Sequence, residues 1–269
     1  MTLSGATVLL TGSALGIGQA TAAHVARLGA DVIGIDLDTD RQRETQALVE
    51  VSGKRYTALA ADVTDGPALR AAVATASAVG FDIVVTSAGV APAGPFVGDG
   101  PGETMDVWRA AIEVNLLGTM ATVHAALPHL LEKKRGHIVT LASVAGHVGV
   151  PGIAAYAASK HGVVGFCEAL AGEVRKKGVG VSWICPTLVQ TRMTDGVEPS
   201  AMIPMLKPEA IAEAVAQAVE QNHTEVFVPR RMRSLVSVFP ALAPKVARRL
   251  LSRDPVTKGW QSLRRGLPG

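Results

Sequence analysis

Runs of almost uninterrupted apolar residues recur along the first 228 residues of this chain, and most are followed by a longer amphipathic stretch. The segments "VIGID", "DIVVT" and "GHIVTL" are typical. A strand with one face in water alternates apolar and polar residues, whereas a continuous run indicates a parallel strand that is covered on both faces. The pattern therefore predicts an α/β fold with a parallel sheet between two helix layers. We expect strands at about residues 6–11, 31–36, 56–61, 81–86, 135–141, 179–185 and 225–228.

Charge is divided unevenly between a long body and a short tail. Residues 1–228 carry 16 Lys and Arg against 22 Asp and Glu, and residues 229–269 carry 10 against 1. The body shows no internal repeat and no low-complexity linker. We therefore interpret residues 1–228 as one domain and residues 229–269 as a basic amphipathic C-terminal extension. Apolar residues recur at helical spacing in the extension, whereas Pro240 and Pro244 argue against one straight helix.

Composition narrows the class of protein. Only 4% of the residues are aromatic, which leaves few stacking platforms for bases, so nucleic acid is not an expected partner. Cys167 and Cys185 form no disulfide framework, and neither the cysteines nor the seven histidines show a recognised zinc spacing, so no metal is expected. No basic region precedes the first apolar stretch, and no run approaches the roughly 20 apolar residues that cross a bilayer. We expect a cytoplasmic protein.

The segment "TGSALGIG" follows the first expected strand and opens a helix near Ile17. Its glycines allow a tight turn and let backbone N–H groups approach a pyrophosphate, which the positive end of the helix also attracts. The second strand ends at Asp36, where a carboxylate can accept hydrogen bonds from the ribose hydroxyls of adenosine. That carboxylate would repel a 2′-phosphate, and Leu15 and Leu37 supply no cation. The pattern favours NAD over NADP, although two arginines lie near in sequence.

A second group of polar residues lies in "SVAGHVGVPGIAAYAASKHG". Tyr156 and Lys160 are spaced i, i+4, which places both on one face of a helix. A tyrosine with a pKa near 10 is a poor base at neutral pH, but an ammonium group and a positive nicotinamide would stabilise its phenolate. Lowering that pKa by about three units corresponds to about 4 kcal/mol. Such a tyrosine can exchange a proton with an alcohol oxygen, and Ser143, at the end of the fifth expected strand, could hydrogen-bond that oxygen.

With these motifs in this order, the sequence resembles the classical short-chain dehydrogenase/reductase family over about residues 5–228. The family's glycine motif corresponds to residues 11–18, and its adenine contact corresponds to Asp62 and Val63. The four catalytic residues of the family correspond to Asn115 in "IEVNLLG", Ser143, Tyr156 and Lys160. The resemblance implies a single Rossmann-type, doubly wound domain with a seven-stranded parallel sheet in the order 3-2-1-4-5-6-7. It also implies that the dinucleotide lies across the strand-order switch.

The resemblance further implies a role for each site residue. Tyr156 would be the general acid/base, Lys160 would hold the nicotinamide ribose and tune the tyrosine, Ser143 would orient the substrate oxygen, and Asn115 would hold a water in a proton relay. The expected catalytic residues are therefore Asn115, Ser143, Tyr156 and Lys160. The expected cofactor contacts are Thr11, Gly12, Ser13, Leu15, Gly16, Ile17, Gly18, Asp36, Leu37, Asp62, Val63, Ser87, Ala88, Gly89, Asn115, Tyr156, Lys160, Pro186, Val189 and Thr191.

The chain departs from the family pattern at two places. The family's Asn-Asn-Ala-Gly is "TSAG" at residues 86–89, which lacks the asparagine amides that help to tie the sheet near the cofactor. The family's glycine after Pro186 is Thr187, whose side chain must be accommodated near the nicotinamide. Neither change removes a catalytic group, so both bear on local geometry and on the substrate pocket.

The expected pocket walls are apolar, with methionines on a lid at about residues 188–207, and such walls suit bulky apolar molecules. We expect substrate contacts from Ser143, His147, Val148 and Met193. The sequence thus predicts an NAD-dependent oxidoreductase that interconverts a secondary alcohol and a ketone on a lipophilic substrate of hydroxysteroid, retinoid or long-chain acyl type. An NADP-dependent carbonyl reductase of the same family remains an alternative. So does a cofactor-bound regulatory or binding protein with little turnover.

The resemblance also implies a homodimer or homotetramer, formed through helices at about residues 103–131 and 153–178. The extension has arginines around an apolar middle, at residues 230–253. That pattern suits a lid over the pocket, a subunit interface or a peripheral contact with an anionic membrane surface. The sequence leaves these three roles open.

Overall fold

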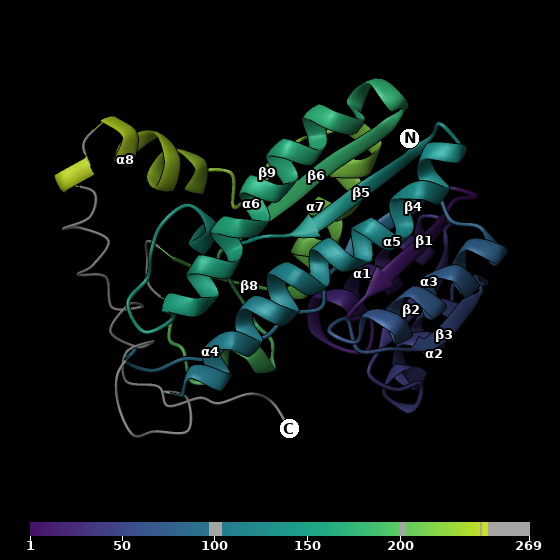
Figure 1. Cartoon of the computed structure of the whole chain (residues 1–269), viewed down its shortest axis with the longest axis horizontal. Helices are drawn as coiled ribbons and strands as arrows, with labels where there is room; N and C mark the ends of the chain where they lie inside the picture. The colour runs from purple at the N-terminus through teal and green to yellow at the C-terminus, as the bar shows by residue number, and fades with distance from the viewer. Residues whose placement is uncertain (97–103, 200–202, 243, 247–269) are drawn as a thin grey trace.

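The computed structural model describes residues 1–96, 104–199, 203–242 and 244–246 (Figure 1). Its main sheet has seven parallel strands in the order β3-β2-β1-β4-β5-β6-β9. This confirms the predicted fold class and strand order, with β9 as the seventh strand of the prediction. The strands are β1 (Thr7–Thr11), β2 (Asp31–Asp36), β3 (Tyr56–Ala60), β4 (Ile83–Thr86), β5 (Gly136–Leu141), β6 (Val179–Pro186) and β9 (Glu225–Val228).

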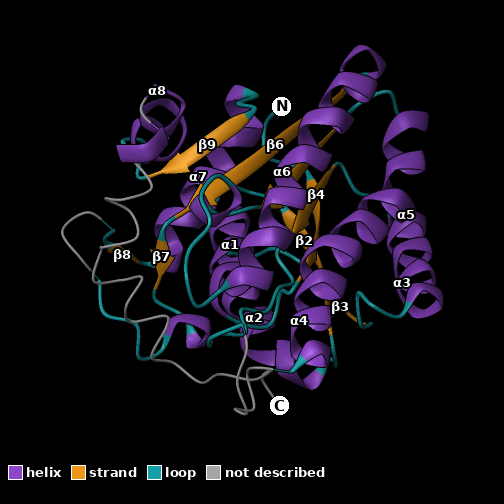
Figure 2. Ribbon diagram, turned by 60° about the vertical axis from the view of Figure 1, so that its left-hand side comes forward, coloured by secondary structure: helices purple, strands orange, loops and turns teal. Residues whose placement is uncertain are grey.

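Helices cover both faces of the sheet (Figure 2). One face packs on α1 (Gly16–Arg27), α2 (Arg43–Glu50) and α7 (Pro208–Gln221), and the other on α3 (Gly66–Val79), α5 (Thr119–Glu132) and α6 (Ala154–Val174). Successive residues of β1 enter opposite core layers: Val8 and Leu10 pack with the first set, and Leu9 packs with the second. Because neighbouring side chains of a strand point to opposite faces, both faces must be apolar. This is the physical reason for the uninterrupted apolar runs.

A long helical stretch, residues 105–132, runs through α4 (Met105–Ile112), the π-helical turn η2 (Glu113–Gly118) and α5. Its 28 residues are long and apolar enough to match the length and composition of a membrane span, which the sequence analysis did not anticipate. The apolar side chains also serve the domain: α5 packs against α3, α4 packs against α6, and Val123 and Leu130 are buried in the core.

Two short strands that the sequence did not predict, β7 (Leu188–Val189) and β8 (Met205–Leu206), pair in parallel to form a second sheet. They hold the two ends of the segment that was expected to be the substrate lid. The short helix η5 (Arg192–Thr194) lies between them. Residues 200–202 of the expected lid lie outside the described residues.

The C-terminal extension begins by packing on the domain. Met232 and Val236 are buried in the same core layer as Phe227. The π-helical turn η6 (Ser234–Val238) leads into α8 (Phe239–Leu242), so the backbone is helical through Pro240. Pro240 has no N–H to donate, and the hydrogen bonding becomes π-helical in the turn before it. Figure 1 shows α8 standing away from the sheet. Residues 243 and 247–269 lie outside the described residues, so membrane contact stays a prediction.

Candidate active site

The glycine-rich turn between β1 and α1 is closed by backbone contacts that leave no room for a side chain. Gly12 and Gly16 have φ of +69° and +57°, a region that favours glycine. A Cβ on Gly12 would lie 2.6 Å from the nitrogen of Ala88, and a Cβ on Gly18 would collide with the Gly12 carbonyl. The turn therefore needs glycine to bring β1, α1 and the loop after β4 together. It also leaves the first backbone N–H groups of α1 available for a phosphate.

A buried polar group that sequence reasoning missed supports this turn. The Tyr56 hydroxyl lies 2.8 Å from Gln42 Oε1 and 2.9 Å from Ser13 Oγ, and Thr45 Oγ1 donates to the Ser13 carbonyl at 2.9 Å. Burial raises the pKa of Tyr56 to about 12, so its hydroxyl stays neutral. The Ser13 side chain points into this group, so only the Ser13 main chain can face a cofactor. The partners come from β3 and the region of α2, and no local motif signals them.

Asp36 lies beside the turn at the end of β2 with a fixed carboxylate. Its Oδ2 accepts from the Ala14 nitrogen at 2.9 Å, and its Oδ1 accepts from the Leu37 nitrogen at 2.9 Å. Leu15 and Leu37 beside it are 43% and 54% exposed. Exposed leucines next to a fixed carboxylate suit the apolar face and the ribose hydroxyls of an adenosine. The residues at this end therefore fit a dinucleotide.

Other expected cofactor residues lie in the segments after β3 and β7. Asp62 Oδ1 accepts from the Thr64 nitrogen and hydroxyl, both at 2.8 Å, and Val63 is buried against Gly118. On the opposite side, a Cβ on Gly16 would lie 3.1 Å from Thr191 Cγ2. The segment after β7 thus faces the glycine turn, as expected of a chain segment that contacts the nicotinamide end. The remaining expected contacts near these groups are Ile17, Ser87, Pro186 and Val189.

The two departures from the family pattern have different outcomes. Thr86 Oγ1 is buried and has no hydrogen-bond partner among the described residues, so the threonine does not replace the amide contacts of an asparagine. Thr187 is accommodated: its hydroxyl donates to the Pro204 carbonyl at 3.1 Å, and its nitrogen donates to the Val228 carbonyl at 3.1 Å. Thr187 therefore ties the far end of the expected lid to β6 and β9.

The four expected catalytic residues lie in one connected group. Lys160 Nζ donates to the Leu141 carbonyl at 2.6 Å and lies 5.7 Å from the centre of the Tyr156 ring. The Ser143 side chain lies close enough to the Tyr156 hydroxyl to act on its pKa. Asn115 Nδ2 donates to Ser159 Oγ at 3.0 Å. Ser159 Oγ in turn donates to the main-chain carbonyl of Tyr156 at 2.7 Å. Asn115 sits in the π-helical turn η2, a distortion that is frequent at functional sites.

Burial dominates the protonation of the two central groups. It raises the pKa of Tyr156, an effect that the hydrogen bond with Ser143 partly offsets, and it lowers the pKa of Lys160 to about 8. The lower pKa expected for the tyrosine relies on the charges of the lysine and of a bound nicotinamide, and burial opposes their effect. Desolvation disfavours the charged form of each group. The chain by itself therefore holds Tyr156 as a neutral phenol, which is the form that donates a proton.

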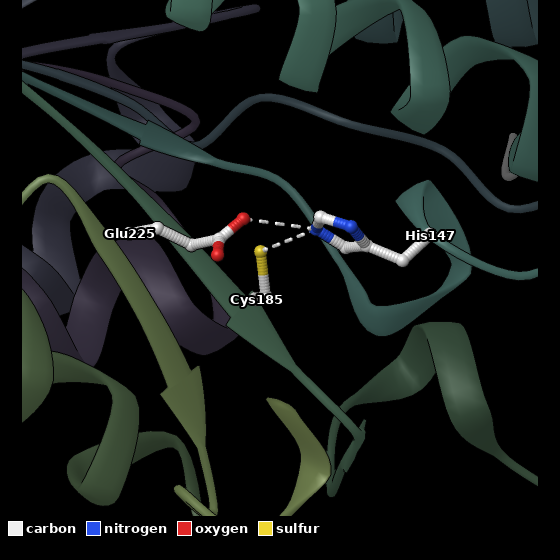
Figure 3. A group of neighbouring side chains, drawn as sticks. All are labelled: His147, Cys185 and Glu225. Atoms are coloured by element: carbon white, nitrogen blue, oxygen red, sulfur yellow. Dashed lines mark hydrogen bonds and ion pairs between the residues drawn. The ribbon is translucent and has the colours of Figure 1, made fainter. Parts of the chain in front are cut away.

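The expected substrate residues surround this group unequally. Met193 lies over the loop after β4, since a Cβ on Gly89 would be 4.0 Å from Met193 Cε. Val148 is partly buried against the core. His147 instead directs Nε2 toward Glu225 and Cys185 (Figure 3), two residues that the sequence analysis did not connect with it. Burial, followed by the Glu225 carboxylate, raises the pKa of the Cys185 thiol well above its usual value.

Comparisons with known proteins agree with this geometry. A profile of the family described as short chain dehydrogenase matches residues 6–201. "Oxidoreductase UcpA" of Salmonella typhimurium is 36% identical over 220 residues, which cover 81% of each chain. Human "Epidermal retinol dehydrogenase 2" is 29% identical over 236 residues, 85% of this chain and 75% of that protein. The structure of carveol dehydrogenase from Mycobacterium avium in complex with NAD matches with a TM-score of 0.75 at 28% identity. The match covers 84% of this chain and 96% of that protein. Other solved structures of similar fold hold NAD or NADP.

Proposed function

Because this chain belongs to the short-chain dehydrogenase/reductase family, we propose that it is an NAD-dependent dehydrogenase that interconverts a lipophilic secondary alcohol and its ketone. The family establishes the reaction class, oxidation and reduction between a hydroxyl and a keto group with a nicotinamide cofactor. The observation that carries the proposal for this chain is the grouping of Tyr156 with the Ser143 side chain, which acts to lower the tyrosine pKa, and with the buried Lys160 ammonium, which lies 5.7 Å from the centre of the Tyr156 ring.

The chemistry follows from what each side chain offers. In the oxidation, a carbinol C–H bond and an O–H bond break and a C=O bond forms. NAD, when bound, would be the hydride acceptor. The alcohol oxygen is oriented by the Ser143 hydroxyl, and its proton passes to Tyr156 Oη, which must first be a phenolate. Lys160 stabilises that phenolate through its charge. In the reduction, Tyr156 starts as the neutral phenol and donates its proton to the carbonyl oxygen.

Asp36 supports NAD as the cofactor. The Ala14 and Leu37 nitrogens hold its two carboxylate oxygens in place, so the negative charge cannot turn away from an adenosine ribose without losing two hydrogen bonds. A 2′-phosphate at that position would meet this charge directly and would be repelled. The unmodified ribose hydroxyls of NAD can instead donate to the carboxylate.

The surroundings of Tyr156 support a lipophilic substrate. Its ring packs on an apolar cluster that also contacts two residues of the expected lid, Ile203 and Met205. The buried members of that cluster are Ala93, Ala145, Ile153, Ala157, Leu188 and Val197. Two relatives are named for apolar alcohols, carveol and retinol. A polar sugar or a short polyol would bring hydroxyl groups to such walls without hydrogen-bond partners.

A substrate panel with one pair of variants tests the proposal. The panel compares sterols, retinoid alcohols, long-chain secondary alcohols and short polyols, each with NAD and with NADP. We expect kcat/KM to be highest for a lipophilic alcohol with NAD. Tyr156→Phe should lower kcat on the order of 10²- to 10⁴-fold and retain NAD binding.

The other tyrosine supplies the matched control, because Tyr56→Phe removes a buried hydroxyl at the cofactor turn and should change stability or the KM for NAD instead of kcat. Unchanged turnover in Tyr156→Phe would refute the assigned proton donor. Activity confined to polyols would refute the substrate class, and an equal kcat/KM with NADP would refute the cofactor.

A further inference from the structure

Three side chains from distant parts of the sequence meet beside the active site. His147 follows the short helix η3 (Val144–Gly146), Cys185 lies near the end of β6, and Glu225 begins β9. His147 Nε2 lies 3.6 Å from Cys185 Sγ and 3.3 Å from Glu225 Oε1, and one ligand atom from each residue lies within 4.8 Å of the others. Figure 3 shows the imidazole, the thiol and the carboxylate converging on one point.

The arrangement differs from a nucleophilic cysteine site. In a relay of nucleophile, histidine and carboxylate, the nucleophile contacts one ring nitrogen and the carboxylate contacts the other. Here the thiol and the carboxylate both approach Nε2 (Figure 3), so the imidazole cannot pass a proton from one to the other. Three different donor groups around one point are instead the arrangement that a metal cation requires.

We propose that His147, Cys185 and Glu225 form a zinc-binding site with three protein ligands and an open fourth position. A tetrahedral zinc ion lies about 2.3 Å from sulfur and about 2.0–2.2 Å from nitrogen and oxygen, which places neighbouring ligand atoms about 3.3–3.6 Å apart. The two measured separations, 3.6 Å and 3.3 Å, match these values. Thiolate and imidazole ligands select zinc over Mg²⁺ and Ca²⁺, which prefer sites made of oxygen atoms.

Neighbouring residues orient the proposed ligands. Trp183 Nε1 donates to Glu225 Oε1 at 3.0 Å, and the His147 ring packs on the Phe227 ring with centroids 5.0 Å apart. The register of β6 and β9 pairs Trp183 with Glu225 and Cys185 with Phe227. Alternate residues of a strand share a face, so both ligands and both supporting aromatic residues project to the same side of the sheet. Hydrogen bonds and packing of this kind fix ligand orientation in metal sites.

The site is accessible from solvent. The side chains of His147 and Glu225 are 15% and 21% exposed, whereas Cys185 is fully buried. A pocket of about 560 Å³ at β9 has Glu225 and Phe227 in its lining, together with residues of α7 and Arg233. An ion that binds beside the partly exposed imidazole and carboxylate would displace the proton of the thiol. Binding would tie the loop that carries Ser143 and His147 to β6 and β9.

Cobalt absorption spectroscopy tests the proposal on the full chain, without an affinity tag and after dialysis against a chelator. Co²⁺ occupies tetrahedral zinc sites, and a cobalt–thiolate bond absorbs in the near ultraviolet. We expect one equivalent of Co²⁺ to give this band and Zn²⁺ to abolish it. Cys185→Ser should lose the band, and Glu225→Gln, which keeps an oxygen acceptor for Trp183, should weaken Co²⁺ binding about 10- to 100-fold.

The second cysteine of the chain provides the matched control. Cys167 is also buried, but it lies in α6 and is not part of the cluster, so Cys167→Ser should keep the band and the Co²⁺ affinity. Circular dichroism establishes that each variant is folded, and Glu225→Gln tests the site without altering a buried cysteine. Co²⁺ binding without a thiolate band, a band that survives in Cys185→Ser, or Co²⁺ affinity unchanged in Glu225→Gln would overturn the proposal.

Discussion

The cofactor side and the substrate side of the active site are built from different kinds of contact. On the cofactor side, one unit of strand, turn, helix and strand supplies both the glycine turn and Asp36, and the close contacts are between main-chain atoms. On the substrate side, Thr187 reaches Pro204, and His147 reaches Cys185 and Glu225. These residues come from separate segments that only the folded sheet brings together. The closest contacts of Gly12 and Gly18 on the first side are therefore with main-chain atoms, whereas the second side is held by side chains from separate segments.

The largest effect should come from a methyl group in the cofactor turn. In Gly18→Ala the new Cβ would collide with the Gly12 carbonyl and lie 3.2 Å from Ser13 Cα. Because these are main-chain atoms, the turn has to open, at a cost of about 3 kcal/mol or more. We expect NAD affinity, measured by calorimetric titration, to fall at least about 100-fold.

A glycine without such neighbours is the control for this change. Gly172 lies in α6, and a Cβ added there would meet open space, with no neighbouring atom within 4 Å. Gly172→Ala should therefore keep NAD affinity and should stabilise the helix by up to about 1 kcal/mol. If Gly18→Ala binds NAD as tightly as the unchanged chain, the cofactor side is not specified by the close contacts of its glycines.

The same contrast explains what the sequence could predict. The seven strands and their order were predictable because apolar runs and the family motifs are local signals. Strands β7 and β8 have two residues each, which is too short for any periodic pattern. The spacing of cysteine and histidine predicted no metal, and the proposed ligands at positions 147, 185 and 225 meet only because the fold brings the segment after β5 to the paired strands β6 and β9. The rise that burial causes in the pKa of Tyr156 could not be predicted, because burial is a property of the fold.

Acid should reveal a long-range contact at the opposite end of β5. His137 Nε2 lies 2.7 Å from Ser182 Oγ. The Ser182 hydroxyl donates its hydrogen bond to the His223 carbonyl. Nε2 is thus the donor of this hydrogen bond, and because burial lowers the pKa of His137 to about 4 from 6.5, the imidazole is neutral at pH 7. The unfolded chain binds the proton more tightly, so this stability is fully present above pH 6.5 and is lost as the pH falls toward 4. The loss should be about 2 kcal/mol between pH 7 and pH 5.

Denaturant unfolding at the two pH values measures this loss, and His137→Gln separates it from the titration of the carboxylates. Glutamine keeps a donor for Ser182 but does not titrate, so the free energy of unfolding should depend less on pH by about 2 kcal/mol. An identical pH dependence in both proteins would show that His137 is not held neutral. The burial of His137 between distant segments would then contribute nothing to the pH dependence of stability.

The smallest effect should come from the hydroxyl of Thr187, on the substrate side. Thr187→Val keeps the shape of the side chain but leaves the Pro204 carbonyl without its donor, at a cost of about 1 kcal/mol. Because that bond holds the end of the lid and not the cofactor turn, the KM for the lipophilic substrate should rise a few-fold while the Kd for NAD stays the same. Thr187→Ser, which retains the hydroxyl, should restore the KM. Equal changes in KM and in the Kd for NAD would mean that the two sides of the site are mechanically coupled, and the division into a half held by main-chain contacts and a half held by side chains would fail.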